Sequence, residues 1–133
     1  MSGLDGTEAG DAQPDFSTPA LAAAVERLPR AAIDALPFGA IRLDAAGGVV
    51  FYSAAERRLS GYRAEVLARP FFTEIAPCMN TASFRGRIDR ALAAGTLDIA
   101  FDHIGDFDDS GKMLHVRVQS ASGGGCWIFM QRT

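Results

Sequence analysis

The chain has 133 residues, of which 48% are hydrophobic and 22% are charged, as expected for one folded domain with a single core. The formal net charge of -3 argues against a basic surface for nucleic acid or anionic lipid, because such surfaces come from clustered Lys and Arg. No run of about 18 apolar residues suggests a membrane span, and the acidic, Gly-rich start does not resemble a secretory signal. We therefore expect a cytoplasmic protein with two reduced cysteines and no nucleic-acid or membrane partner.

The first part of the chain predicts a loosely attached N-terminal cap. Residues 1–17 are polar with few apolar anchors, which is typical of a mobile lead-in. A helix capped by Thr18 and a second short helix over residues 31–35 are expected to follow. We therefore divide the chain into a flexible or helical cap, residues 1–35, and a core domain, residues 36–133.

A hairpin and a helix are predicted next. Residues 39–44 alternate apolar with polar side chains, and two glycines turn the chain into a second strand over residues 49–52. Ser53 then caps a short helix that ends at Gly61, with Leu59 pointing inward.

Further helical segments are predicted before the chain returns to strands. Residues 64–68 are expected to form one turn, and residues 70–72 open another. Ser83 is expected to cap a longer helix over residues 84–92, whose apolar spacing predicts one buried stripe that includes Leu92.

Three strand-like segments, residues 97–103, 112–120 and 126–131, are separated by stretches rich in turn residues. The order is therefore two strands, several helices and three strands. Grouped strands and grouped helices favour an α+β fold, so we predict one five-stranded antiparallel sheet flanked by helices.

Cys78 is the residue that we expect to carry chemistry. Phe71, Phe72 and Pro77 precede it and would hold its thiol at the edge of an apolar pocket. The segment Tyr52–Gly61 offers a phenol, a carboxyl and a hydroxyl at helical spacings, which suggests a polar cluster facing the cysteine. A thiol in such a place is an inert small hydrophobe, an oxidisable sensor or an attachment point.

Some of these residues also have plain structural interpretations. Glu56 lies three residues after Ser53, so the two can form a capping box in which the carboxylate stays in water. We expect Cys126 to be a packing residue at the start of a strand. His103 and His115 have no partners at metal-ligand spacing, so no metal site is predicted.

Four motifs resemble those of the photoactive yellow proteins, or xanthopsins, which are blue-light receptors with a PAS fold. The motifs are Gly39-Ala40-Ile41-x-Leu43-Asp44, Tyr52-x-Ala54-Ala55-Glu56, Phe71-Phe72-x-x-x-Ala76-Pro77-Cys78 and Trp127-x-Phe129. The resemblance runs from about Leu36 to Arg132. It is specific because the Tyr, the Glu and the Ala-Pro-Cys match together at separations close to those of the family.

The resemblance implies a 4-hydroxycinnamic acid (p-coumaric acid) chromophore bound to Cys78 as a thioester. By motif position, Tyr52 and Glu56 would hydrogen-bond its phenolate oxygen, and Ser60 would support Tyr52. Phe71 and Tyr62 would line the pocket. Tyr62 stands where the family usually has an arginine, so we expect a phenol and no cation over the pocket.

The segment of residues 105–111 corresponds to a lid that carries several aromatics and a methionine in typical members. Here Phe107 alone would provide apolar cover. Because that methionine is thought to assist re-isomerisation, the lid composition predicts a slow return to the dark state.

The implied function is light sensing and not enzymatic turnover. Burial would keep Glu56 protonated, so that after photoisomerisation it gives its proton to the phenolate and leaves an uncompensated buried carboxylate. Such a charge would loosen the N-terminal cap as the signal. The partner would be an unknown downstream protein or a fused phytochrome-like histidine kinase, and a dimer is possible.

Two other functional classes stay open. One is a PAS module that binds a partner or a diffusible ligand without a covalent pigment. The other is a thiol enzyme that pairs Cys78 with His103 or His115. Flavin-based light sensing is not expected, because the Asn-Cys-Arg-Phe stretch of those PAS domains is absent.

Overall fold

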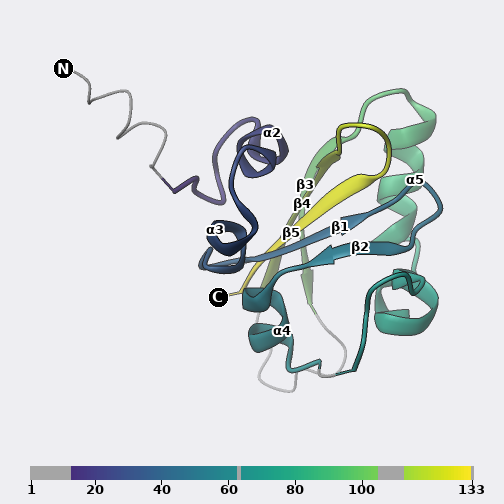
Figure 1. The fold of residues 1–133 in the computed structure, drawn as a ribbon. Coiled ribbons are helices and arrows are strands. Elements are labelled where there is room, and N and C mark those ends of the chain that lie inside the picture. The colour runs from purple at the N-terminus through teal and green to yellow at the C-terminus, as the bar shows by residue number, and fades with distance from the viewer. Residues whose placement is uncertain (1–12, 63, 105–112, 133) are drawn as a thin grey trace.

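The computed structural model describes residues 13–62, 64–104 and 113–132. A five-stranded antiparallel sheet with strand order β2-β1-β5-β4-β3 forms its centre (Figure 1). The strands are β1 (Gly39–Leu43), β2 (Val49–Tyr52), β3 (Asp98–Ile104), β4 (Met113–Ser120) and β5 (Cys126–Arg132). The helices are α2 (Leu21–Glu26), α3 (Arg30–Asp34), α4 (Ala54–Ser60), the π-helical turn η1 (Phe71–Ile75), the 3₁₀ turn η2 (Pro77–Met79) and α5 (Arg85–Ala93). The α+β prediction and all five strands are confirmed.

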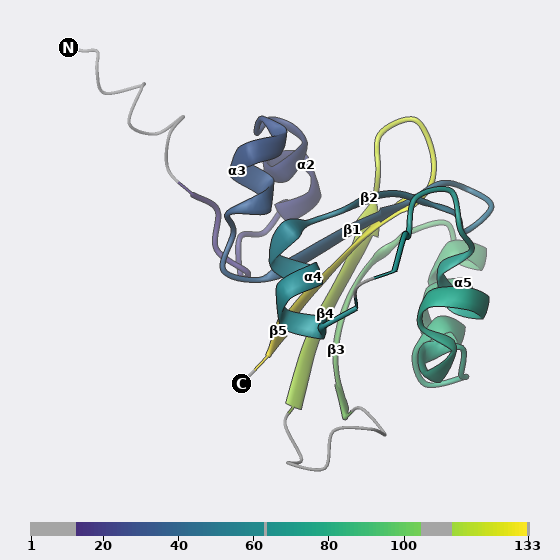
Figure 2. The same ribbon diagram turned by 60° about the horizontal axis from the view of Figure 1, so that its bottom comes forward.

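Helices cover both faces of the sheet. Helices α2 and α3 lie on one face, and the segments from α4 to α5 lie toward the other (Figures 1 and 2). Strand β5 shows the division, because successive side chains point to opposite faces. Cys126, Ile128 and Met130 join the core under η1 and α5, whereas Trp127 and Phe129 join the core under α2 and α3. The sheet thus separates two hydrophobic cores.

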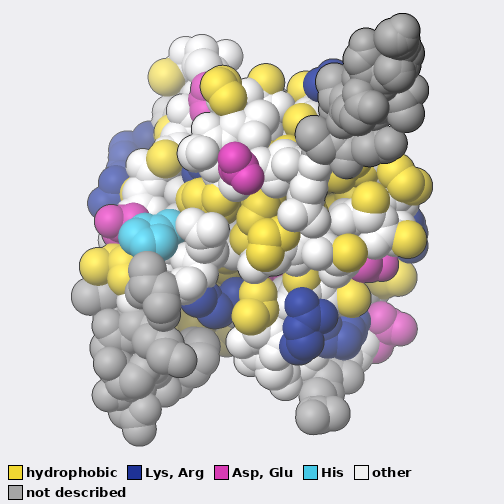
Figure 3. Space-filling view, turned by 90° about the vertical axis from the view of Figure 1, so that its left-hand side faces the viewer, with side chains coloured by type: hydrophobic (Ala, Val, Ile, Leu, Met, Phe, Trp, Pro, Cys, Tyr) yellow, Lys and Arg dark blue, Asp and Glu magenta, His cyan; other side chains and the backbone are white. Residues whose placement is uncertain are grey.

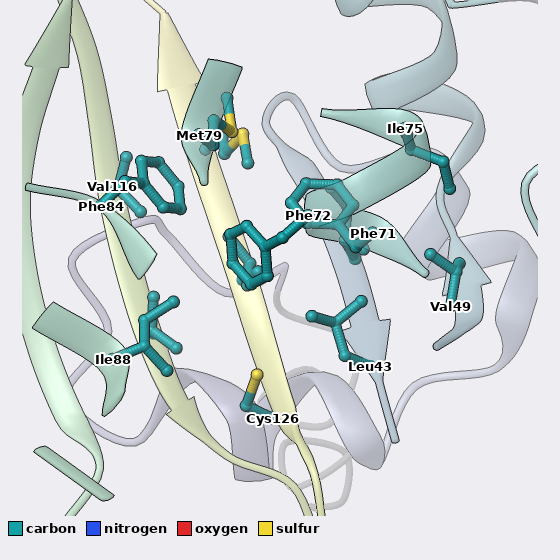
Figure 4. Close-up of a cluster of buried hydrophobic side chains, with 14 of the residues drawn as sticks. Leu43, Val49, Phe71, Phe72, Ile75, Met79, Phe84, Ile88, Val116 and Cys126 are labelled. Carbon is teal, nitrogen blue, oxygen red and sulfur yellow. The ribbon is translucent and has the colours of Figure 1, made fainter. Parts of the chain in front are cut away.

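The core under η1 and α5 is rich in aromatic side chains (Figure 4). The rings of Phe71 and Phe72 meet edge to face with centroids 5.0 Å apart, and those of Phe84 and Phe101 meet similarly at 5.2 Å. Phe72 also contacts Phe84, with centroids 6.1 Å apart. Edge-to-face pairs add stability beyond the area that they bury, so this ring cluster fixes the segment that leads to Cys78.

The N-terminal segment is held against the sheet by β4. The guanidinium of Arg117 donates to the carbonyl oxygens of Phe16, Thr18 and Pro19 at 2.7, 2.6 and 3.0 Å. The ring of Phe16 packs edge-on against Phe38, with centroids 5.6 Å apart. Residues just before α2 therefore contact the domain, although residues 1–12 lie outside the part that the structure describes.

The first helix begins at Leu21, so the prediction that Thr18 caps it was wrong. The amide of Ala22 donates to the side-chain oxygen of Gln119 at 2.7 Å instead of to a carbonyl four residues earlier. The hydroxyl of Thr18 accepts from the amide of Asp15 at 2.9 Å. Bonds from β4 thus replace the first turn that the local sequence favours.

The helix after the hairpin matches its prediction, but the helical turn predicted over residues 64–68 is replaced by a tight turn in which the amide of Arg69 donates to the carbonyl of Val66 at 3.1 Å. Ser53 caps α4, and Gly61 ends it in the left-handed conformation, with φ of 76°. Beyond it, the carboxylate of Glu65 accepts from the amides of the next two residues at 2.9 and 3.3 Å. Ala68 has a positive φ of 66°. These local bonds compete with a helical turn.

Two predictions about buried faces were also wrong. Leu59 and Leu92 are 41% and 54% exposed, so neither points into a core. Helix α5 begins at Arg85, and the hydroxyl of Thr81, not of Ser83, accepts from the amide of Phe84 at 3.2 Å. The buried stripe of α5 is consequently shorter than its apolar spacing suggests.

Glu26 at the end of α2 provides a second attachment of the cap. Its carboxylate accepts from the amide of Ser122 at 3.0 Å and from the indole of Trp127 at 2.8 Å, and Arg42 lies 3.9 Å away. Burial raises the pKa of Glu26, but the two hydrogen bonds and the Arg42 charge outweigh it and bring the pKa below 4.5. A carboxyl with a lowered pKa stabilises the fold above pH 4.5, and this contribution disappears as pH falls through the folded-state pKa.

We therefore expect acid to weaken the attachment of α2, and Glu26→Gln to remove that pH dependence at a cost of about 1 kcal/mol. The fluorescence of Trp127, the single tryptophan, during an acid titration measures how far the attachment of α2 weakens. Glu74→Gln is the matched control, because its ion pair with Arg69 is exposed and contributes little. An identical acid transition in wild type and Glu26→Gln would contradict the assignment.

The surface carries charges of both signs. On the face shown in Figure 3, Lys and Arg side chains lie among acidic, hydrophobic and polar ones and do not form one continuous basic patch among the described residues. None of the helices in the described part of the chain combines the length and the hydropathy that a membrane span requires.

Candidate functional site

A cavity of about 450 Å³ lies between α4, η1, η2 and the sheet. Its volume is in the range of small-molecule pockets. Six of the seven residues predicted for the site line it: Tyr52, Glu56, Ser60, Tyr62, Phe71 and Cys78. The seventh, Phe107, belongs to the predicted lid and lies outside the described residues. The fold therefore brings together residues from segments about twenty positions apart.

Cys78 lies in η2, directly after the π-helical turn. The amide of Ala76 donates to the carbonyl of Phe71 at 2.8 Å, which closes the wide turn. The amide of Asn80 then donates to the carbonyl of Pro77 at 3.0 Å, which holds the 3₁₀ turn. Single π-turns occur frequently at functional sites. Here the turn presents a half-buried thiol, which is in no disulfide, to the cavity.

A hydroxyl pair lies at the polar part of the cavity. The oxygens of Tyr52 and Ser60 are in hydrogen-bond contact at 3.1 Å, and the Ser60 hydroxyl also accepts from the amide of Tyr62 at 3.1 Å. The guanidinium of Arg57 lies over the Tyr52 ring, 5.5 Å from its centroid. Burial raises the pKa of Tyr52, so its phenol keeps its proton and is available as a hydrogen-bond donor.

Glu56 points into the cavity and is 3% exposed. Its two carboxylate oxygens accept from the two terminal nitrogens of Arg132, each at 3.0 Å. The backbone amide of Glu56 donates to the hydroxyl of Ser53 at 3.0 Å, whereas the amide of Ser53 donates to the carbonyl of Ala40 at 2.9 Å. Because the Glu56 carboxylate does not reach back to Ser53, the capping-box interpretation is wrong.

Two opposing effects act on the ionisation of Glu56. Burial raises its pKa, while the hydrogen bonds and the charge of Arg132 pull the pKa back down. Burial is the larger effect, so the pKa of Glu56 lies above 4.5. The expected absence of a cation at this pocket was therefore wrong, since Arg132 takes part in its lining.

Arg132 is the residue that the sequence analysis missed. Strand β5 contains the signal that locates it: side chains at positions 126, 128 and 130 point to the core on the cavity side, and position 132 continues that alternation. Strand pairing places Arg132 opposite Leu114, another lining residue. Arg132 and Glu56 are 76 positions apart in the sequence, so no local pattern indicates that they pair.

The two histidines lie on different faces of the sheet. His103 lines the cavity, and its ring meets Phe84 edge to face at 5.2 Å. His115 is not among the lining residues and contacts the carboxylate of Asp102 at 2.7 Å. Of the two imidazoles considered as partners for the Cys78 thiol, only that of His103 shares its cavity. The described residues contain no group of three side chains arranged to hold a metal ion.

The lining combines three kinds of side chain that suit an aromatic acyl group with a phenolic oxygen. Apolar side chains such as Ile75, Met79 and Met130 would contact a ring. The phenol of Tyr52 and the carboxyl of Glu56 would hydrogen-bond to its phenolic oxygen, and the thiol of Cys78 would form the thioester bond. The donor set therefore fits the chromophore that the motifs imply.

Comparisons with known proteins agree with this geometry. A family model described as the PAS fold matches residues 27–132. The chain is 38% identical over 104 residues to the photoactive yellow protein of Rhodothalassium salexigens, covering 77% of this chain and 83% of that protein. It is 34% identical over 102 residues to the photoactive yellow protein of Halochromatium salexigens, covering 75% and 82%.

A solved structure is similar over most of its length. The photoactive yellow protein domain of the sensor histidine kinase Ppr from Rhodospirillum centenum superposes with a TM-score of 0.73 at 40% sequence identity. The match covers 82% of this chain and 97% of that domain.

Proposed function

Since this chain belongs to the photoactive yellow protein family of PAS domains, we propose that it is a blue-light photoreceptor that carries a p-coumaroyl group as a thioester on Cys78. One observation carries the proposal. Cys78 lines the same cavity as Tyr52 and Glu56, although it lies more than twenty positions further along the chain. A thiol near a phenol and a buried carboxyl provides both the attachment and the hydrogen bonds that such a group requires.

The bound chromophore would supply light absorption and a double bond that isomerises. The residues of the chain have separate tasks. Cys78 would form the thioester bond, and its backbone amide would donate to the acyl oxygen. Tyr52 donates to the phenolic oxygen and is itself held by Ser60 at 3.1 Å. Phe71 and Tyr62 exclude water from the cavity.

Glu56 acts as the proton donor in this proposal. Burial favours its protonated form, in which it can donate a hydrogen bond to a phenolate. When the hydrogen bond to the phenolate weakens or the phenolate becomes more basic, the proton moves from Glu56 to the phenolic oxygen. Glu56 is then a carboxylate. The proposed cycle converts no substrate and releases no product, so it involves no catalytic turnover.

We assign residues 1–35 as the cap that responds to this change and residues 36–133 as the sensor core. The described part of the cap, residues 13–35, is attached by polar bonds from Arg117, Gln119 and Trp127 and by a small set of buried side chains, Leu21, Val25 and Ile33 among them. Segments of a protein open separately at a cost that depends on how much such contact they make. Release of the cap would inform a downstream protein or a kinase domain, as suggested by the similar domain of a sensor histidine kinase.

Loading the purified protein tests the function. We expect activated p-coumaric acid to give a visible absorption band that stays with the denatured chain, bleaches under blue light and returns in the dark. A folded protein with no visible band would contradict the proposal and favour a PAS module that binds a partner without a pigment.

A further inference from the structure

The ion pair between Glu56 and Arg132 joins two distant parts of the fold at the cavity. Helix α4 supplies Glu56, and the end of β5 supplies Arg132. Both N–O distances are 3.0 Å, and each carboxylate oxygen has its own nitrogen. This bidentate arrangement is among the stronger hydrogen-bonded charge pairs in proteins.

The two partners differ in exposure. The side chain of Glu56 is 3% exposed, and that of Arg132 is 25% exposed. Arg132 therefore keeps contact with solvent while its guanidinium reaches a carboxylate that does not. A buried carboxylate without such a partner is strongly disfavoured.

The other charged and titratable groups near Glu56 do not take this role. The guanidinium of Arg57 donates to the carbonyls of Tyr62 and Ala64 at 3.5 and 3.0 Å and lies over the ring of Tyr52. The protonated Tyr52 phenol carries no charge, and the His103 ring in the same cavity packs edge to face against Phe84. Of the arginines in the described part of the chain, only Arg132 pairs with the Glu56 carboxylate.

We infer that Arg132 is the resident cation of the pocket and pairs with whichever acidic group there carries the negative charge. In the free protein that group is the Glu56 carboxylate. The next two states rest on the function proposed above. In the loaded protein with Glu56 protonated, the negative charge is on the phenolate oxygen. After the proton has moved to that oxygen, the negative charge is on the Glu56 carboxylate again. The proton moves between two acids, and the total charge of the pocket stays constant.

This arrangement changes the consequence of proton transfer. A Glu56 carboxylate paired with Arg132 is not an uncompensated buried charge. The carboxylate that remains after proton transfer is therefore stabilised at the pocket by Arg132. Arg132 acts as a positioning residue for Glu56.

The ionisation of Glu56 in the protein without chromophore tests the pair directly. NMR of protein labelled at the glutamate carboxyl carbons follows five glutamates, and Glu56→Gln identifies the signal of Glu56. We expect Arg132→Met to make Glu56 hold its proton about tenfold or more tightly, because burial then acts unopposed. Arg132→Lys keeps the charge without the bidentate geometry and should fall between wild type and Arg132→Met.

Arg58→Met is the matched control, since it removes one arginine charge from the exposed side of α4. It should leave the titration of Glu56 unchanged. A Glu56 titration that is the same in wild type and Arg132→Met, or that shifts equally in Arg58→Met, would overturn the inference. If Arg132→Met does not fold, Arg132→Lys alone decides.

Acid titration of the loaded protein tests the second partner. We expect Arg132→Met to lose the visible band at higher pH than wild type, because the phenolate has lost its cation. An unchanged band would overturn the exchange of partners and leave Arg132 a partner of Glu56 only. Failure of wild type to form any band would overturn the proposed function, while the NMR titration would still decide the role of Arg132.

Discussion

Replacing Cys78 with alanine should abolish the visible band completely after treatment with activated p-coumaric acid. The Cys78 thiolate attacks the activated carbonyl, a carbon–sulfur bond forms and the activating group leaves. Alanine has no nucleophile for this step. The pocket itself should survive, because Tyr52, Glu56 and Ser60 are held by other elements. Absorption spectra and the mass of the intact chain measure the result.

Cys126→Ala is the matched control. Cys126 lies in the core beside Leu43 and Phe72 (Figure 4), and it is 7% exposed. Burial raises the pKa of its thiol to about 11, so almost none of it is thiolate at neutral pH. We expect Cys126→Ala to load as wild type does. A covalent band that survives in Cys78→Ala, or one lost in Cys126→Ala, would show that the attachment site is not Cys78.

The parts of the fold that the sequence predicts correctly depend on neighbouring residues. The alternation over residues 39–52 and its two glycines specify a hairpin within fourteen positions. Ser53 and Gly61 likewise mark both ends of α4, because the cap and the left-handed residue act on adjacent backbone groups. Such signals need no knowledge of the rest of the chain.

The incorrect predictions involve bonds between distant segments or competing side chains. Helix α2 starts late because Gln119, nearly a hundred positions away, takes the amide that would close its first turn. Residues 64–68 do not form a helical turn because the Glu65 carboxylate accepts hydrogen bonds from the next two amides. Propensity describes only what the local chain prefers, and tertiary bonds override it.

The site was predictable in its residues but not in its charge balance. The resemblance to the family indicated six residues that do share one cavity. It gave no indication of Arg132, because the family position for a cation lies at Tyr62, next to α4. Only the register of β5 and the approach of α4 to β1 bring the guanidinium to Glu56. The alternation along β5 indicates the face on which Arg132 lies, but only the three-dimensional structure pairs it with Glu56.

Gly39→Ala should disturb the Glu56 carboxyl by crowding it from strand β1. Gly39 is buried in β1, and a Cβ added there would overlap Oε1 of Glu56 and come within 2.9 Å of its Cδ. Glu56 must then move, which breaks its bonds to Arg132. We expect a loss of about 3 kcal/mol in the free energy of unfolding and a fall in Tm of roughly 10 °C. In the loaded protein the visible band should disappear at higher pH, because the phenolate has lost a donor.

Two comparisons separate this effect from the ordinary consequences of replacing glycine. Gly86→Ala in α5 should stabilise the protein by about 0.5–1 kcal/mol, because the nearest atom to its Cβ is the flexible end of Arg90 at 3.2 Å, and the Ala82 Cβ and the Thr81 carbonyl oxygen lie at an ordinary contact distance of 3.6 Å. In a Glu56→Ala background Oε1 and Cδ are gone and only the Cβ contact at 3.0 Å remains, so Gly39→Ala should cost much less there. Denaturant unfolding of the four proteins in this cycle measures the coupling. If Gly39→Ala is equally costly with and without the Glu56 side chain, the space at Gly39 serves the strand and not the carboxyl. If most of the stability lost in Gly39→Ala is not lost in the Glu56→Ala background, the glycine in β1 is what allows the carboxyl of Glu56 in α4 to meet Arg132 in β5.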